Sequence, residues 1–195
     1  MARIVAGSAK GRILKVPATH TRPTSERVRE ALFSRLEHMG YVEGCAILDL
    51  YAGSGAFALE ALSRGAAYAE CVDSQKQAAR IIEQNARTCG VQVAVTCAKV
   101  AKRLAGPPTR LFDVVFLDPP YDMPDEEVAD ALRTLPPHMA EDGIVLVERS
   151  KRSPEPEWGE DFVLLDERTW GDTRVWFAEC TTTNGGAESL LSRPE

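Results

Sequence analysis

The chain has 195 residues, of which 44% are hydrophobic and 27% charged, and this balance is typical of one soluble globular domain. No apolar run approaches the roughly 20 residues of a membrane-spanning helix, and the start of the sequence lacks the apolar segment of a secretory signal. We therefore expect a cytoplasmic protein, a monomer with no membrane partner. The five cysteines show no C-x-x-C spacing, so free thiols are expected and no metal is implied.

The net charge of −6 is unevenly distributed. Residues 1–29 carry a net charge of +6, which leaves −12 for the rest of the chain. A basic arm on an acidic body is typical of an edge that binds a polyanion, although a solvated hairpin without a partner has the same pattern. The candidates for phosphate contacts are Arg3, Lys10, Arg12 and Arg22. Arg22 could instead close over a cofactor.

The predicted elements begin with a β-hairpin over residues 3–16, followed by a helix that Thr24 or Ser25 caps and Gly40 ends. Strands and helices then alternate. Strands are expected at 45–51, 68–72, 91–97, 112–117 and 143–147, and helices at 57–62, 75–89 and 126–135. A second hairpin is expected from strands at 162–165 and 174–177.

This order predicts an α/β, Rossmann-like fold, with a mostly parallel sheet between helices and an antiparallel edge from the closing hairpin. We expect residues 1–40 to form a basic hairpin-and-helix extension and residues 41–180 to form the main domain. Residues 181–195 are small and polar, so a disordered tail is expected there.

The first chemical motif follows the strand at 45–51. It comprises Asp49, Tyr51, Ala52, Gly53, Ser54 and Gly55. Glycines at the carboxyl end of a buried strand let the backbone approach a ligand. Asp49 would repel a pyrophosphate, but it suits a cofactor that carries an amine and a sulfonium. The alternative is an acid that only caps backbone amides.

The second motif is Asp73, at the end of the next strand. An acid there can accept hydrogen bonds from both ribose hydroxyls of an adenosine. NAD and S-adenosylmethionine share that ribose, so Asp73 does not choose between them. A surface aspartate that starts a helix would look the same.

The third motif, Asp118-Pro119-Pro120-Tyr121, chooses between these cofactors. The prolines fix the backbone and remove two amide donors, so the intervening carbonyl is held outward as an acceptor. Asp118 and this carbonyl can hold an exocyclic amine by its two hydrogens, with its lone pair aimed at a methyl donor. Tyr121 offers a face for an extracted base.

These motifs resemble the amino-methyltransferase branch of the class I fold, and more closely the bacterial small-subunit (16S) ribosomal RNA guanine-N2 methyltransferase family. The resemblance covers roughly residues 3–178. The matching segments are 3–7, 10–12, 22–24, 27–33, 48–55, 60–66, Asn85, 118–121 and 171–173.

The resemblance implies a seven-stranded sheet, S-adenosylmethionine as cofactor and guanine N2 of 16S ribosomal RNA as target, either free or in a small-subunit assembly particle. It also gives the basic arm a role in RNA binding. Two departures matter. Asp73 stands where the family usually has glutamate, and residues 97–100 offer no clear acid or amide for the adenine ring.

Other functions remain open at this point. An ionised carboxylate only accepts hydrogen bonds, which favours guanine, with its adjacent N1–H and N2–H groups, over adenine. An adenine-N6 or protein-glutamine methyltransferase would use the same tetrad. A nicotinamide-dependent oxidoreductase is supported only by the glycine turn and Asp73. A non-catalytic RNA-binding assembly factor would not need Asp118 to Tyr121.

Overall fold

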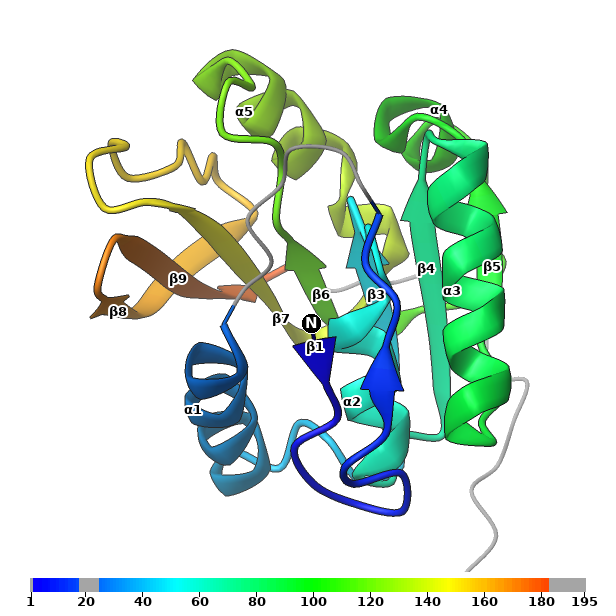
Figure 1. The fold of residues 1–195 in the computed structure, drawn as a ribbon. Coiled ribbons are helices and arrows are strands. Elements are labelled where there is room, and N and C mark those ends of the chain that lie inside the picture. The colour runs from blue at the N-terminus through cyan, green and yellow to red at the C-terminus, as the bar shows by residue number, and fades with distance from the viewer. Residues whose placement is uncertain (1, 18–24, 183–195) are drawn as a thin grey trace, which may run out of the picture.

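The computed structural model describes residues 2–17 and 25–182. A seven-stranded sheet dominates it, in the order β5-β4-β3-β6-β7-β9-β8 (Figure 1). The strands are β3 (Ala46–Leu50), β4 (Tyr68–Asp73), β5 (Ala94–Cys97), β6 (Phe112–Leu117), β7 (Met139–Ser150), β8 (Phe162–Trp170) and β9 (Thr173–Cys180). Strands β3 to β7 pair in parallel, and β9 runs antiparallel to both of its neighbours. The predicted fold class is confirmed.

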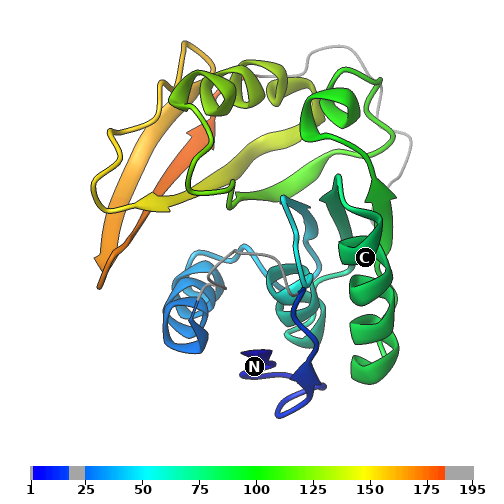
Figure 2. The same cartoon turned by 45° about the horizontal axis from the view of Figure 1, so that its top comes forward.

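Helices cover both faces of the sheet (Figure 2). One face packs against α1 (Glu26–His38), α2 (Ala56–Ser63) and α3 (Lys76–Cys89), and the other against α4 (Val100–Leu104), α5 (Asp125–Thr134) and the short helix η1 (Pro136–His138). Strands β3 and β6 are mostly apolar because they have helices on both sides, with Asp49 as the buried acid of β3. Their carboxyl ends therefore meet at one edge of the molecule.

The boundaries differ from the prediction at several elements. Strand β5 begins at Ala94 rather than Val91, because the backbone N–H of Val91 donates to the carbonyl of Ala86 and completes the end of α3. Helix α4 was not predicted, since five residues are too few to show a helical period. Strands β7, β8 and β9 are longer than their apolar cores indicated.

The amino-terminal hairpin is confirmed, with only the short strands β1 (Ala2–Arg3) and β2 (Ile13–Leu14). It packs against helices α2 and α3. The Glu60 carboxylate accepts the backbone N–H groups of Val5 and Ala6 at 2.8 and 2.9 Å. Gly7 passes so close that a Cβ atom there would lie 1.8 Å from the carbonyl oxygen of Ser63. Only glycine fits this contact.

Helix α1 begins after Ser25, whose hydroxyl accepts the backbone N–H of Val28 at 3.2 Å. Of the two caps predicted, Ser25 is therefore the one used, and Thr24 lies outside the described residues. The predicted tail at 181–195 also falls largely outside them. Thr181 still continues from the sheet, since its N–H donates to the Asp161 carbonyl at 2.9 Å.

Candidate active site

A glycine turn connects β3 to α2 at the carboxyl edge of the sheet. Tyr51, Gly53 and Gly55 adopt φ angles of 64°, 55° and 73°, in the left-handed region that favours glycine. Tyr51 is the unusual member, because a non-glycine residue in this region is strained. At Gly55 a Cβ atom would also lie 3.1 Å from the Ile82 side chain. The turn is therefore held tightly against α3.

A first cavity of about 390 Å³ opens beside this turn. Of the predicted cofactor residues, Tyr51, Gly53 and Asp73 line it. The other lining residues are Pro17, Ser74, Gln75, Ala78, Lys99, Val100, Ala101, Asp118, Pro120, Met123, Glu127, Asp130, Ala131 and Thr134. The cavity thus runs from the ends of β3 and β4 to helices α4 and α5.

Asp73 connects two parts of this wall. Its Oδ2 atom accepts the backbone N–H of Gly53 at 2.9 Å, and its Oδ1 atom accepts that of Gln75 at 2.8 Å. Both carboxylate oxygens retain lone pairs for a further donor. Asp73 is therefore placed to meet a ligand hydroxyl while it fixes the backbone around it.

Asp49 lies behind the turn rather than on the cavity wall. Its side chain is 2% exposed, and its Oδ2 atom accepts the backbone N–H of Ala58 at 3.3 Å. Burial raises the pKa of Asp49 to about 8, with further contributions from the negative charges of Asp118 and Asp73. This position matches the alternative of an acid that caps backbone amides. Its direct role in cofactor binding stays a prediction.

The remaining turn residues also shape the backbone without lining the cavity. The N–H of Ala52 donates to the Val72 carbonyl at 3.0 Å, and the carbonyl of Ser54 accepts from Asn85 Nδ2 at 2.9 Å. The N–H of Gly55 donates to the Ala52 carbonyl at 2.7 Å. Their contribution to the site is to hold Tyr51 and Gly53 in position.

The first cavity fits an adenosine-type cofactor. Ala78, Val100, Ala101 and Ala131 offer apolar surface for a flat ring, and Asp73 offers acceptors for a ribose. Sequence reasoning left the adenine pocket unassigned. The structure brings Lys99, Val100 and Ala101 to this wall at the start of α4, the helix that the sequence did not reveal.

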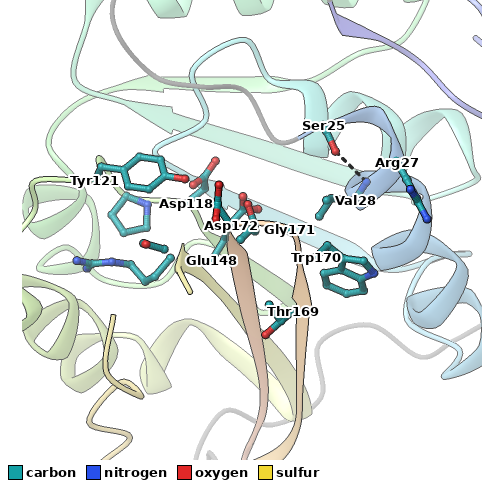
Figure 3. A pocket seen from close by; sticks show the side chains of 14 residues that line it. Ser25, Arg27, Val28, Asp118, Tyr121, Glu148, Thr169, Trp170, Gly171 and Asp172 are labelled. Carbon is teal, nitrogen blue, oxygen red and sulfur yellow. Dashed lines mark hydrogen bonds between the residues drawn. The ribbon is translucent and has the colours of Figure 1, made fainter. Parts of the chain in front are cut away.

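A second cavity of about 450 Å³ lies on the other side of Asp118 (Figure 3). Its lining residues are Ser25, Arg27, Val28, Asp118, Pro119, Tyr121, Glu148, Arg149, Ser150, Thr169, Trp170, Gly171, Asp172 and Thr173. They come from the start of α1, the Asp-Pro-Pro-Tyr tetrad, the end of β7 and the turn between β8 and β9. Figure 3 shows Tyr121 on one side of the cavity and Trp170 on the other.

The tetrad separates the two cavities. Asp118 lines both of them, Pro119 lines the second and Pro120 the first. The N–H of Asp118 is directed toward the Leu50 carbonyl at 3.5 Å, which ties the tetrad to the end of β3. Tyr121 is 56% exposed at the rim of the second cavity, so its ring is available for stacking. A group entering from either cavity therefore meets Asp118.

Several residues of the second cavity were not identified as functional from the sequence. Glu148 carried no signal beyond its charge, and Arg27 was noted only for its charge and as part of the family resemblance. Gly171 and Asp172 were recognised only as a turn and as part of the family resemblance. Trp170 was likewise read as a turn residue. The tertiary structure brings them together because β7 pairs with β6 on one side and with β9 on the other, with Ser150 at the end of β7 opposite Thr173 at the start of β9.

Three of the predicted RNA-binding residues lie in the amino-terminal hairpin. Arg3 forms an ion pair of 2.9 Å with Glu26, next to the residues of α1 that line the second cavity. Lys10 and Arg12 are exposed, and the carbonyl of Arg12 accepts the backbone N–H of Ile4 at 3.0 Å. The turn of the hairpin packs against Ser63 at the end of α2. Arg22 lies outside the described residues.

Within residues 2–17 and 25–182, no group of three or more histidine, cysteine or acidic side chains is arranged to hold a metal ion. Among the helices formed by those residues, none has the length and apolarity needed to cross a membrane.

Comparison with known proteins gives consistent matches along the chain. Residues 2–179 match the model of the family described as "Conserved hypothetical protein 95". The chain is 36% identical to the Bacillus subtilis protein named "Putative rRNA methyltransferase YlbH", over 89% of this chain and 96% of that protein. It is 34% identical to "Ribosomal RNA small subunit methyltransferase D" of Haemophilus influenzae, over 87% and 89% respectively.

Solved structures show the same fold. The hypothetical protein TTHA0928 of Thermus thermophilus superposes with a TM-score of 0.79 at 30% identity, over 91% of this chain and 98% of that one.

Proposed function

The chain belongs to the family described as "Conserved hypothetical protein 95", and from that membership we propose that it transfers a methyl group from S-adenosylmethionine to the exocyclic N2 of a guanine in 16S ribosomal RNA. The observation that carries the proposal is the position of Asp118 between two cavities. A cofactor bound in the first cavity and a base bound in the second would face each other across this carboxylate. That the substrate is ribosomal RNA is inferred from the names of the relatives.

S-adenosylmethionine, when bound, supplies an electrophilic methyl group on its sulfonium. The first cavity would hold it with Asp73 at the ribose, the backbone of Gly53 beside it, and Val100 and Ala101 at the ring. Asp118 would face the positively charged sulfonium. The attraction between these opposite charges is stronger in a site shielded from water than in bulk solvent. No step needs a metal ion.

On the other side, the second cavity takes the extracted base. Asp118 and the Pro119 carbonyl accept the two hydrogens of the exocyclic amine and turn its lone pair toward the first cavity. Tyr121 stacks on the base. After transfer, the surplus proton leaves to Asp118 or to water. A neutral aromatic amine is a weak nucleophile. The main contribution of the protein is therefore to align this amine with the methyl group.

The nearest rival is methylation of an adenine N6 or a glutamine side chain, because the tetrad suits any planar amine. The rRNA methyltransferase names favour RNA over protein, and the choice between guanine and adenine depends on the family resemblance and on the donor pattern of the bases.

The test is to incubate the protein with labelled S-adenosylmethionine and with ribosomal RNA from cells that lack this protein. Both free RNA and isolated small-subunit particles are used, and the nucleosides are then separated by mass spectrometry. We expect N2-methylguanosine at one position of 16S RNA, absent from the untreated RNA. N6-methyladenosine, or label only in peptides, would establish the rival. Intact RNA binding without any transfer would indicate an assembly factor.

A further inference from the structure

Glu148 is a buried acid of the second cavity that the mechanism above does not use. Its side chain is 7% exposed, and it lies in β7, the strand next to the one that leads into the tetrad. Strands β6 and β7 pair in parallel with Leu117 opposite Val147. Asp118 and Glu148 are the next residues on each strand, so they stand side by side at the carboxyl edge, about 4.8 Å apart in backbone position.

Both side chains are also directed to the same face of the sheet. Side chains alternate along a strand, and Leu117 and Val147 pack together on the face of α4 and α5. The residues that follow them are therefore directed to the opposite face, toward α1 and α2. Figure 3 shows the oxygen atoms of Asp118 and Glu148 in the central part of the second cavity.

Charged groups of both signs line this cavity. Arg27 and Arg149 lie in its wall with Asp118, Glu148 and Asp172, and Arg149 is paired with Asp125 at 3.2 Å and Asp172 with Lys151 at 2.7 Å. The neighbouring carboxyl groups of Asp118 and Glu148 would repel a phosphate placed beside them. They suit instead a group with several N–H donors on one edge.

We propose that Glu148 selects guanine by accepting the hydrogen bond of guanine N1–H while Asp118 holds the neighbouring N2 amine. This inference rests on the proposed function and names the residue that gives it base specificity. In guanine, N1–H and the N2 amine lie next to each other, as do the two acids. Adenine in the same pose presents the N1 lone pair to Glu148, and two acceptors repel each other.

A residue in this role affects the choice of base more than it affects the methyl-transfer step. An enzyme that hydrogen-bonds one substrate group discriminates strongly against an analogue that lacks it, because the buried polar group is left unpaired. Substituting the acceptor should therefore change the preference between bases more than it changes the chemistry of the amine. Glu148 contacts the base without holding the reacting amine, and its effect is measured as the ratio of kcat/KM for two substrates.

The experiment compares guanine with 2-aminopurine, which keeps the N2 amine but has a lone pair at N1. Each is placed at the mapped position of 16S RNA by ligating a synthetic segment, and kcat/KM for methyl transfer is measured on the free RNA and on assembled small subunits. We expect the unchanged protein to prefer guanine by about ten- to a hundredfold. Glu148→Gln should reduce that preference by about tenfold or more, because an amide can donate to N1.

Two further variants keep the comparison clear. Glu148→Asp retains a carboxylate and should keep the preference for guanine even at lower turnover. Glu141→Gln removes the same charge from an exposed position near the other end of β7 and should leave both the rate and the preference unchanged. The loss of O6 in 2-aminopurine affects every variant alike, so the change between proteins reports on N1.

The outcomes are distinguishable. If Glu148→Gln slows both substrates by the same factor while it still binds S-adenosylhomocysteine, Glu148 has another role and the inference is overturned. The same holds if the unchanged protein shows no preference for guanine. If the unchanged protein makes no N2-methylguanosine at all, the proposed function itself fails, and this inference fails with it.

Discussion

The Oδ2 atom of Asp73 reaches from the end of β4 to the glycine turn after β3, where it accepts the backbone N–H of Gly53 at 2.9 Å. Its Oδ1 atom accepts the N–H of Gln75, just before α3, at 2.8 Å. One side chain therefore holds together the two backbone segments that line the same end of the first cavity. Asp73 therefore stabilises the turn and also lines the cavity proposed for the cofactor.

Replacing Asp73 by alanine should weaken both the turn and the cofactor site. Two backbone donors would lose their acceptor, so we expect a loss of about 1–3 kcal/mol in the free energy of unfolding. Affinity for S-adenosylhomocysteine should fall about tenfold or more. Calorimetry and urea denaturation measure these quantities, with Glu83→Ala on the exposed side of α3 as control. Unchanged affinity in Asp73→Ala would remove Asp73 from the cofactor site.

Replacing Asp118 by alanine should separate catalysis from binding. We expect methyl transfer to fall by about a hundredfold or more, because the amine loses an acceptor that aligns it in the transition state. Binding of S-adenosylhomocysteine should change only slightly, since most of the first cavity is untouched. Single-turnover assays and calorimetry test this on the same preparation. Near-normal turnover with intact RNA binding would contradict the role given to Asp118.

The pKa of Asp49 predicts a pH dependence of stability. Burial raises this pKa from 3.8 to about 8 in the folded protein, so between these values the native state holds a proton that the unfolded chain releases. The contribution of Asp49 is fully present below about pH 4 and is lost as the pH rises to about 8, at up to about 1.4 kcal/mol per pH unit.

Urea denaturation of the unchanged protein and Asp49→Asn at pH 5, 6.5 and 8 measures this contribution. The asparagine can still accept the N–H of Ala58 but does not titrate. We expect the difference in unfolding free energy to shift in favour of Asp49→Asn as the pH rises. Parallel pH profiles for the two proteins would show that the pKa of Asp49 is not strongly raised in the folded protein.

Glu60 should be essential for docking of the amino-terminal hairpin. Its buried carboxylate accepts the N–H groups of Val5 and Ala6, and it pairs with Arg64 at 2.8 Å and with the buried Arg29 at 3.4 Å. Glu60→Ala would leave the Arg29 charge buried without this acid, so we expect a loss of about 3–5 kcal/mol. Hydrogen exchange should become faster at the amides of Val5 and Ala6. Persistent protection there would mean that the hairpin is held by its apolar contacts alone.

The basic hairpin is predicted to contact RNA phosphates. Lys10→Glu combined with Arg12→Glu should weaken RNA binding and lower its salt dependence, because each lost phosphate contact reduces the number of counterions released. Lys102→Glu, at an exposed position of α4 on the opposite face of the sheet, is a control for a single charge reversal, and it is compared with Lys10→Glu alone as well as with the double variant. Filter binding at several salt concentrations gives the slope. Equal effects of the double variant and the control would place the RNA elsewhere.

The sequence alone determined the fold class and the chemistry-bearing turns. Alternating apolar strands and helices set the parallel sheet, and acids or glycines after strands 45–51, 68–72 and 112–117 marked its carboxyl edge. These signals are local, since periodicity, glycine and proline act on neighbouring residues. They led to Tyr51, Gly53, Asp73 and the tetrad, all of which line a cavity.

Only the tertiary structure decided which residues of the tetrad line which cavity and what else surrounds them. Asp49 follows the pattern of a cofactor acid but lies behind the turn, because α2 covers it. Glu148 carries no signal in its own segment, and only the register of β6 and β7 places it beside Asp118. Parallel strands are joined by long crossover connections, so their order and pairing depend on packing between residues far apart in the sequence.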